Sequence, residues 1–258
     1  MTGPKKSLGQ HWLKDRAILQ AIADETKICS NDTVLEIGPG LGTLTGELLS
    51  RANKVIAVEF DEQLANKLPG QYPGKNLEVI AADILDYDLS PLPEGYIVVA
   101  NVPYYITSKI IKKLMTASNK PKVAILLVQK EVAQRLASQP GEMSMLAVSA
   151  QVYANVKLGI EVSREYFTPP PEVDSQVVAL ETRLTPLVAS DCEKQFFQVV
   201  RAGYSEKRKK LRSSLAGGLH LSKESVDDAL AKAGLDVNAR AQELSIADWQ
   251  RLLSYIVI

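Results

Sequence analysis

The stretch Thr33-Val-Leu-Glu-Ile-Gly-Pro-Gly-Leu-Gly42 decides the fold of this chain. Its first half, Thr33–Ile37, is a short apolar run typical of a buried strand, and its second half is a glycine-rich turn. Glycine there lets the backbone turn tightly and approach a ligand closely. Apolar residues at helical spacing follow Thr43, which we expect to cap a helix. The stretch therefore predicts a strand, a ligand-binding turn and a helix in succession.

The same alternation continues along the chain. Further strands are expected at Lys54–Glu59, Leu77–Ile80, Tyr96–Ala100 and Val123–Val128, with helices at Asp15–Lys27 and Lys130–Ser138. Strands that alternate with helices predict an α/β fold of the Rossmann-like kind, a doubly wound and mostly parallel sheet. Ligands of such sheets bind beyond the carboxyl ends of the strands, where the glycine turn lies.

The pattern changes in the second half of the chain. We expect strands at Met145–Val162 and Ser175–Thr182, and then helices at Phe196–Arg201, Val226–Ala233 and Ile246–Ile256, with Gly217-Gly218 and Gly234 as breaks. The sequence therefore predicts two domains, a catalytic domain over 1–184 and a small all-α domain over 185–258.

Composition limits the class of protein. The 258 residues are 46% hydrophobic and 23% charged, which suits one sizeable core and a small second domain. Cys29 and Cys192 match no metal spacing and favour a reducing, cytoplasmic compartment. We expect no signal peptide and no membrane contact, since no apolar run is long enough for a membrane span. The net charge of zero argues weakly against a nucleic-acid partner.

Two acids follow the glycine turn at the ends of successive strands. Glu59 can accept two hydrogen bonds from a ribose diol, and Asp83 can accept one from an adenine amino group. The turn departs from the dinucleotide pattern G-x-G-x-x-G, because Gly42 comes one residue early and Thr43 takes its place. A lone acid at a strand end is as often a cap or a surface residue. The glycine turn, Glu59 and Asp83 follow three successive strands in this order, which favours a nucleoside site over capping or surface roles.

Asn101-Val-Pro-Tyr104 ends the fourth predicted strand. The exocyclic amine of adenine is a poor nucleophile because its lone pair is delocalised into the ring. A pair of acceptors, the Asn101 side-chain oxygen and the Val102 carbonyl, can hold both N–H groups and favour a pyramidal nitrogen. Pro103 fixes the turn and keeps Val102 extended. Tyr104 offers a flat face for stacking the base, although an ordinary turn with a buried tyrosine is the alternative.

Phe167 precedes the stiff run Thr168-Pro-Pro-Pro171. By itself a phenylalanine is more often part of the core. A rigid proline loop beside an active site can, however, hold an aromatic face against the other side of the base. We therefore expect Phe167 to stack on the base opposite Tyr104, with a core position as the alternative.

Several stretches together resemble the ribosomal RNA adenine dimethyltransferases, in particular the small-subunit, kasugamycin-sensitivity type. They are Lys6-Ser-Leu-Gly-Gln-His-Trp-Leu13, Val34-Leu-Glu-Ile-Gly-Pro-Gly-Leu-Gly42, Asn101-Val-Pro-Tyr-Tyr-Ile-Thr-Ser108, Phe167-Thr-Pro-Pro-Pro-Glu-Val-Asp-Ser175 and Lys209-Lys-Leu-Arg-Ser-Ser-Leu215. The resemblance implies S-adenosylmethionine as methyl donor, with cofactor-binding residues at His11, Leu13, Gly38, Gly40, Glu59, Asp83 and Asn101. Many members carry Asn where this chain has His11.

The resemblance also implies the substrate and the architecture. Such enzymes transfer two methyl groups to each of two adjacent adenosines in the 3′-terminal hairpin of small-subunit (16S) RNA, within a precursor 30S subunit. A seven-stranded sheet with a reversed last strand and a helical C-terminal domain are implied as well. We expect a monomer. We also expect no metal, because His11 and His220 are the only histidines and form no cluster.

Three rival functions remain open. The antibiotic-resistance type of this fold methylates adenine in large-subunit RNA and shares the N-terminal motifs. A DNA adenine methyltransferase would usually carry separate target-recognition insertions. A ribosome assembly factor with a vestigial site is a non-enzymatic alternative, against which the intact glycine and acceptor motifs argue.

A basic cluster near residue 210 is the final feature. It comprises Lys207, Arg208, Lys209, Lys210 and Arg212, with Glu206 as the neighbouring acid. A charge run is usually a solvated helical face. Because the whole chain has no net charge, the remainder must be net acidic, and the positive charge is concentrated here. We expect the cluster to bind RNA phosphates.

Overall fold

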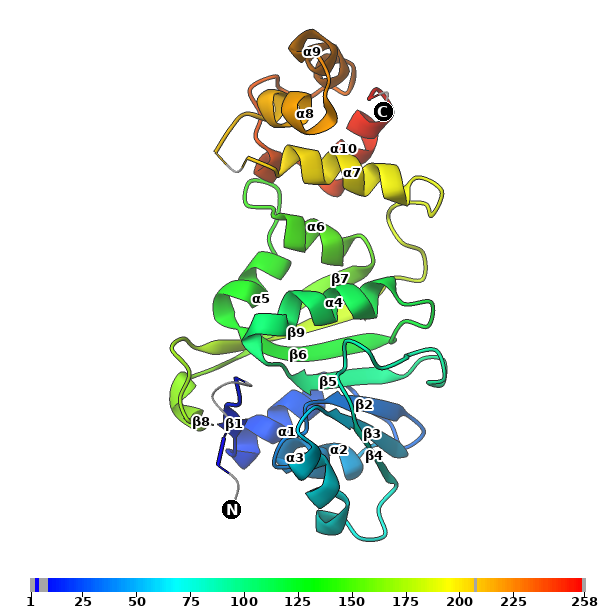
Figure 1. The fold of residues 1–258 in the computed structure, drawn as a ribbon, viewed down its shortest axis with the longest axis vertical. Coiled ribbons are helices and arrows are strands. Elements are labelled where there is room, and N and C mark those ends of the chain that lie inside the picture. Colours follow the sequence, from blue (N-terminus) through cyan, green and yellow to red (C-terminus); the bar gives the residue numbers. More distant parts are fainter. Residues whose placement is uncertain (1–2, 5–8, 207, 257–258) are drawn as a thin grey trace. The chain divides into compact units, whose positions relative to one another are not determined.

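The computed structural model describes residues 3–4, 9–206 and 208–256. The chain forms two compact units, the first from Met1–Gln134 and Ala154–Thr182 and the second from Arg135–Tyr153 and Arg183–Ile258. The segment 135–153 thus packs with residues far along the chain. Figure 1 gives the succession of elements. A functional boundary at residue 184 stays a prediction.

The first unit is built on a seven-stranded sheet in the order β4-β3-β2-β5-β6-β9-β7 (Figure 1). Its strands are β2 (Thr33–Ile37), β3 (Lys54–Glu59), β4 (Leu77–Ala81), β5 (Ile97–Asn101), β6 (Val123–Gln129), β7 (Ala154–Val162) and β9 (Ser175–Thr182). Neighbours from β4 to β6 pair in parallel, and β9 runs antiparallel to both β6 and β7. The seven-stranded sheet with a reversed last strand is confirmed.

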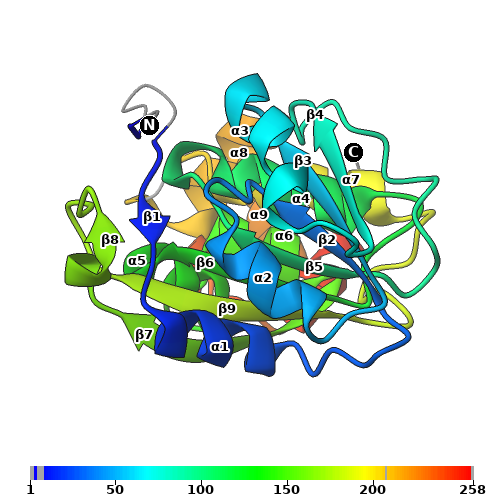
Figure 2. The same ribbon diagram turned by 90° about the horizontal axis from the view of Figure 1, so that it is seen from below.

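Helices cover both faces of this sheet, and the inner strands are therefore mainly apolar. The helices are α1 (Arg16–Glu25), α2 (Thr43–Leu49), α3 (Glu62–Lys67), α4 (Thr107–Thr116) and α5 (Lys130–Leu136). α1 packs against α2, and α4 lies on the other face of the sheet (Figure 2). Right-handed crossovers between parallel strands produce this arrangement. It leaves the carboxyl ends of β2 to β5 free to form a site.

A separate two-stranded sheet ties the N-terminal segment to the proline loop. β1 (Trp12–Leu13) pairs antiparallel with β8 (Phe167–Thr168), so that Leu13 lies opposite Phe167. The peptide between Thr168 and Pro169 is cis. Short 3₁₀ turns complete the unit, η2 (Pro69–Gln71), η3 (Tyr104–Ile106) and η4 (Arg164–Tyr166). Residues more than 150 positions apart in sequence, such as His11 and Pro169, are thereby neighbours.

The regular elements in the described residues of the second unit are all helices. It contains α6 (Met145–Gln151), α7 (Glu193–Gly203), α8 (Leu211–Leu219), α9 (Lys223–Lys232), η5 (Ala241–Glu243) and α10 (Ile246–Leu253). Its core surrounds Trp249, a fully buried side chain. A Cβ at Gly203 would lie 2.3 Å from the Trp249 ring, so only glycine lets α7 approach this closely. Backbone bonds from Gly141 and Met143 to the Gln242 carbonyl attach segment 135–153 to this unit.

The expected strand over Met145–Val162 is wrong in its first part. Met145–Gln151 forms helix α6, and only Ala154–Val162 is a strand. The Ser144 side chain accepts a hydrogen bond from the Ala147 amide at 3.1 Å and so caps the helix. A short apolar run does not distinguish a buried strand from a buried helix, because both lack polar positions.

Two smaller expectations also change. Thr43 does not cap α2, because the cap position belongs to Gly42 at φ +84°. The Thr43 hydroxyl instead donates to the Leu13 carbonyl at 2.9 Å and fastens the N-terminal segment. Gly217 and Gly218 do not break the chain but lie inside α8. A Cβ at Gly218 would come within 2.7 Å of the Ala202 side chain, so glycine here permits close helix packing.

None of the helices in the described part of the chain is both long and apolar enough to cross a membrane.

Candidate active site

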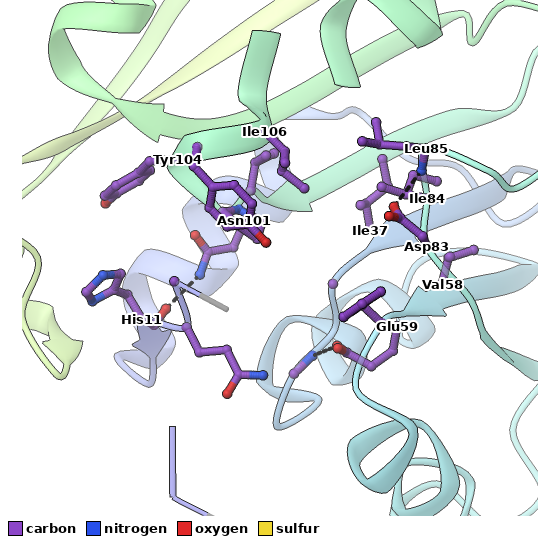
Figure 3. A pocket seen from close by; sticks show the side chains of 18 of the residues that line it. His11, Ile37, Val58, Glu59, Asp83, Ile84, Leu85, Asn101, Tyr104 and Ile106 are labelled. Carbon is purple, nitrogen blue, oxygen red and sulfur yellow. Dashed lines mark hydrogen bonds between the residues drawn. The ribbon is translucent and has the colours of Figure 1, made fainter. Parts of the chain in front are cut away.

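A cavity of about 300 Å³ lies beyond the carboxyl ends of the parallel strands in the first unit (Figure 3). Figure 3 shows Glu59 and Asp83 on one side of it and His11 and Tyr104 on the other. Most of the predicted site residues line it, namely His11, Gly38, Gly40, Glu59, Asp83, Asn101, Val102, Pro103 and Tyr104. The predicted residues Leu13 and Phe167 do not.

The carboxylate of Glu59 fixes the conformation of the glycine turn through hydrogen bonds. Gly40, at φ +57°, donates its amide to the Glu59 Oε2 at 2.9 Å, and the Asp61 amide donates to Oε1 at 2.9 Å. Each carboxylate oxygen accepts one of these bonds, the Phe60 amide donates to the same carboxylate, and acceptor capacity remains for a further donor. Burial raises the pKa of Glu59, while the amide donors oppose the rise. Glu59 thus fixes the glycine turn, and its carboxylate can still accept hydrogen bonds from a ligand in the cavity.

The turn also leaves room for a ligand. A Cβ added at Gly38, where φ is +68°, would meet only the Asn101 carbonyl oxygen, at 4.0 Å. Asp83 follows β4, and its Oδ1 accepts from the Leu85 amide at 2.8 Å. Its Oδ2 has no hydrogen-bond partner among the residues described. The open space above the glycine and the two acids across from it fit a nucleoside with a ribose diol and an amino group.

Glu36 is a buried acid that we did not assign to the site from the sequence. It lies on β2 directly under the turn, is 1% exposed, and its Oε2 has no partner among the described residues. Burial raises the pKa of Glu36 to about 8, with the charge of Glu59 adding to the rise. Burial thus favours the neutral form of this carboxyl. An acid inside an otherwise apolar strand was the signal that could have identified it.

The side chain of Asn101 is fixed in orientation by the N-terminal segment. Its Nδ2 donates to the His11 carbonyl at 3.1 Å (Figure 3). Its Oδ1 has no hydrogen-bond partner within the described residues and borders the cavity. The next residue, Val102, donates its amide to Leu127 at 3.2 Å, and Pro103 is extended at φ −56° and ψ 125°. Oδ1 and the Val102 carbonyl are thus the acceptors available for an amine.

Tyr104 is held by contacts from two distant segments, those of Ser175 and His11. Its hydroxyl shares a hydrogen bond of 2.7 Å with the hydroxyl of Ser175, a residue that is 0% exposed at the start of β9. Its ring lies nearly parallel to that of His11, at 18° and 5.9 Å between centroids. The Nδ1–H of His11 donates to the Pro169 carbonyl at 2.7 Å. Ser175 was not among the predicted site residues, although it ends a stretch that carried the family resemblance.

Phe167 lies in the apolar core in this structure, which was the alternative to a stacking position. Its side chain is 3% exposed and belongs to the apolar cluster that contains Leu13, Leu19 and Ile22. The pairing of β1 with β8 brings Phe167 opposite Leu13 and fills the space below the N-terminal segment. In this conformation the ring does not line the cavity, and Leu13 is likewise part of the core. This conformation favours the core alternative, and stacking of Phe167 on a base stays a prediction.

A volume-conserving change tests this reassignment. Phe167→Leu should lower the free energy of unfolding by about 1 kcal/mol, because an apolar swap of similar size repacks at small cost. Methyl transfer at saturating substrate should stay close to wild type. Denaturant unfolding and single-turnover assays of the same preparation give both values. Unchanged stability together with a strongly reduced rate would restore the stacking role.

The basic cluster lies in the second unit, between α7 and the first turn of α8. Lys207 is outside the described residues. Arg208 is exposed and forms no side-chain hydrogen bond or ion pair with a described residue, whereas Lys209 pairs with Glu206 at 2.5 Å and Lys210 donates to Asn238 at 2.6 Å. Arg212 is half-buried and pairs with Asp227 of α9 at 2.7 Å, which favours a structural role for it.

No group of three His, Cys, Asp or Glu side chains that could hold a metal ion occurs in the described ranges.

Comparisons with known proteins agree with this geometry. The family model "Ribosomal RNA adenine dimethylase" matches residues 1–257. Curated relatives named ribosomal RNA small subunit methyltransferase A, from Dehalococcoides mccartyi strain CBDB1 and Clostridium botulinum strain Langeland, are each 40% identical. They cover 96% of this chain and 87% and 92% of their own lengths respectively.

Solved structures give the same result. A dimethyladenosine transferase from Plasmodium falciparum is 29% identical over 94% of this chain and 96% of its own, with a TM-score of 0.81. The 23S rRNA methyltransferase ErmE is 30% identical over 95% of this chain and 98% of its own, with a TM-score of 0.77. With its Rossmann-like sheet, its glycine turn and its Asn-Val-Pro-Tyr motif at the cavity, the chain belongs to the ribosomal RNA adenine dimethylase family.

Proposed function

We propose that this protein dimethylates N6 of two adjacent adenosines in the 3′-terminal hairpin of small-subunit rRNA. Family membership gives the reaction class, S-adenosylmethionine-dependent dimethylation of adenine in ribosomal RNA. The proposal adds the hairpin, a precursor 30S subunit as substrate, the cytoplasm as location and a monomeric enzyme. The 40% identity to relatives named for the small subunit supports this choice over the large-subunit alternative.

The orientation of Asn101 is the observation that carries the proposal. Because Nδ2 is engaged by the His11 carbonyl, Oδ1 must face the cavity as an acceptor. An amide free to flip would present a donor half of the time, and a donor would repel the N–H groups of adenine. Together with the Val102 carbonyl, Oδ1 would hold both N6 hydrogens and direct the nitrogen lone pair away from the ring.

The other cavity residues fit the methyl donor and the base. Glu59 would accept from the ribose hydroxyls, Asp83 from the adenine amine, and the Gly38 backbone leaves space for the remainder of the donor. When bound, S-adenosylmethionine supplies a methyl group on a positively charged sulfur. Tyr104, tethered by Ser175, would stack on the target base. A strong base is unnecessary, since the methylated amine is acidic enough to lose its proton to water.

Methyl transfer to undermethylated small ribosomal subunits tests the proposal. Labelled S-adenosylmethionine is supplied, and the modified nucleotides are then mapped on the 16S and 23S RNA. We expect label on two adjacent adenosines near the 3′ end of 16S RNA. Label on 23S RNA alone would favour the antibiotic-resistance type. Donor binding without transfer to either RNA would favour an assembly factor.

The basic cluster in the second unit would contact RNA phosphates. Replacing Arg208 and Lys210 together by Ala should weaken binding to small subunits and reduce the salt slope by about 0.7–0.9 log units for each phosphate that is no longer bound. Lys194→Ala with Lys223→Ala removes the same charge from other exposed positions of this unit and should leave the slope unchanged. Subunit binding is measured across a salt series. Equal slopes for all three proteins would show that the cluster is only solvated.

A further inference from the structure

The outer face of η3 and α4 begins at the rim of the cavity and has no assigned role. Tyr105 and Lys109 line the cavity mouth, and Lys112 follows one turn further along α4. The three are exposed, while Ile110 and Leu114 on the opposite face of the helix are fully buried. Lys109 and Lys112 are three positions apart and share one side of α4, and Tyr105 lies in the η3 turn that leads into this helix. An aromatic ring and two ammonium groups therefore form one stripe that leads away from the cavity.

Tyr105 is a large aromatic side chain that is mostly exposed, so packing in the core does not account for its presence here. It is 66% exposed, and its hydroxyl has no hydrogen-bond partner among the described residues. Its ring rests against the backbone of Gly9, where a Cβ would lie 3.4 Å from a ring carbon. Its neighbour Tyr104 is bound inside by Ser175. Two successive tyrosines thus present one ring within the cavity and one at its mouth.

The two lysines carry charge that no direct bond within the described residues neutralises. Neither ammonium group forms an ion pair or hydrogen bond with a described residue, whereas Lys113, beside them on α4, donates to the Leu85 carbonyl at 2.8 Å. Three residues of helix separate Lys109 and Lys112 by only about 4.5 Å along the axis. Like charges at neighbouring positions on one helix face repel each other, and a bound anion would relieve that repulsion.

We propose that Tyr105, Lys109 and Lys112 form a track for the single-stranded RNA that flanks the target adenosine. The proposal rests on the function proposed above. An adenosine that enters the cavity must leave its base stack, and its neighbour then loses a stacking partner. Tyr105 supplies a replacement at the mouth, because bases stack on aromatic rings whatever their identity. Lys109 and Lys112 bind the phosphates of the strand as it leaves.

Removing both charges tests the track. Lys109→Ala with Lys112→Ala should weaken binding to undermethylated small subunits and reduce the salt slope by about 1.4 log units, from about 0.7 for each single-strand phosphate contact. The matched control is Lys75→Ala with Lys122→Ala. Those lysines are also exposed. They lie just before β4 and β6, at the amino ends of these strands, whereas the cavity lies beyond the carboxyl ends. The control should keep the wild-type slope, and equal slopes for both pairs would overturn the proposal.

Aromatic replacement tests the stacking step. Tyr105→Ala should raise the KM for small subunits about 10-fold or more, from the known cost of losing one base–aromatic stack. Tyr105→Phe should restore the wild-type KM because it keeps the ring. Since Tyr105 is mostly exposed, thermal unfolding should be the same for all three proteins. A KM for Tyr105→Ala equal to that of wild type, or a Tyr105→Phe variant as weak as Tyr105→Ala, would contradict a stacking role.

Two further measurements separate the possible failures. Protein-free 16S RNA serves as a second probe, and the lysine pair should weaken binding to it as well. A defect seen with subunits but absent with RNA would mean that a ribosomal protein occupies the stripe, which overturns the proposal. Wild-type protein that binds no S-adenosylmethionine would instead defeat the proposed function. A wild-type enzyme that methylates 16S RNA with no effect of the three replacements would defeat only the track.

Discussion

Asn101→Ala should lower the single-turnover rate of methyl transfer about 100-fold or more, the usual cost of deleting one preorganised polar group in an active site. The amide oxygen would hold N6 in the reactive geometry, and alanine offers no acceptor. Binding of small subunits should be almost unchanged, because most of the affinity for RNA comes from phosphate contacts. Rapid-quench assays with saturating subunits and labelled donor measure the rate.

A second asparagine provides the control for this experiment. Asn119 is also partly buried in the first unit and donates to the Leu92 carbonyl at 2.7 Å, outside the cavity. Asn119→Ala should lower stability but leave the single-turnover rate near wild type. If Asn101→Ala behaves like Asn119→Ala, the side chain only anchors the His11 segment and does not act on N6.

Glu59→Ala should weaken S-adenosylmethionine binding by about 2–4 kcal/mol, because it removes charge-assisted hydrogen bonds to the ribose. The variant also deprives the amides of Gly40 and Asp61 of their acceptor. Glu59→Gln should bind with intermediate affinity, since its amide group retains one acceptor oxygen but turns a donor toward one of those amides. Calorimetric titration with the donor gives the affinities.

The neighbouring Glu62 separates specific from general electrostatic effects. It is exposed in the first turn of α3, and Glu62→Ala should bind the donor as wild type does. Acidification provides an independent check. Because burial raises the pKa of Glu59, protonation and the resulting loss of affinity should begin at a higher pH than for an ordinary glutamate. Equal donor affinity for wild type and Glu59→Ala would refute the ribose contact.

The strands could be predicted because each inner strand is buried on both faces. Thr33–Ile37, Lys54–Glu59 and Ser175–Thr182 have the same bounds in the structure as in the sequence prediction. Their apolar runs leave few alternatives. Met145–Gln151 failed for the same reason, since a short apolar run does not reveal whether its partners are strands or helices.

The site could be predicted only where it depends on local sequence. The glycine turn, Glu59, Asp83 and Asn101 each end a strand, and parallel strands bring these ends together. The tether between Tyr104 and Ser175 joins residues 71 positions apart and leaves no periodic signal. The burial of Phe167 could not be predicted either, because the proline-rich sequence around it does not show on which side of a two-stranded sheet the ring packs.

Segment 135–153 belongs to the second unit but lies in sequence between the two parts of the first unit, and this has a consequence for biosynthesis. All strands of the large sheet have been made once Thr182 leaves the ribosome, so the first unit can fold while the rest is still being translated. Segment 135–153 must wait, because its partners, including Gln242 and Phe197, emerge much later. Until then the apolar side chains of α6 stay unprotected. A ribosomal pause within residues 183–258 would prolong this exposure and favour aggregation.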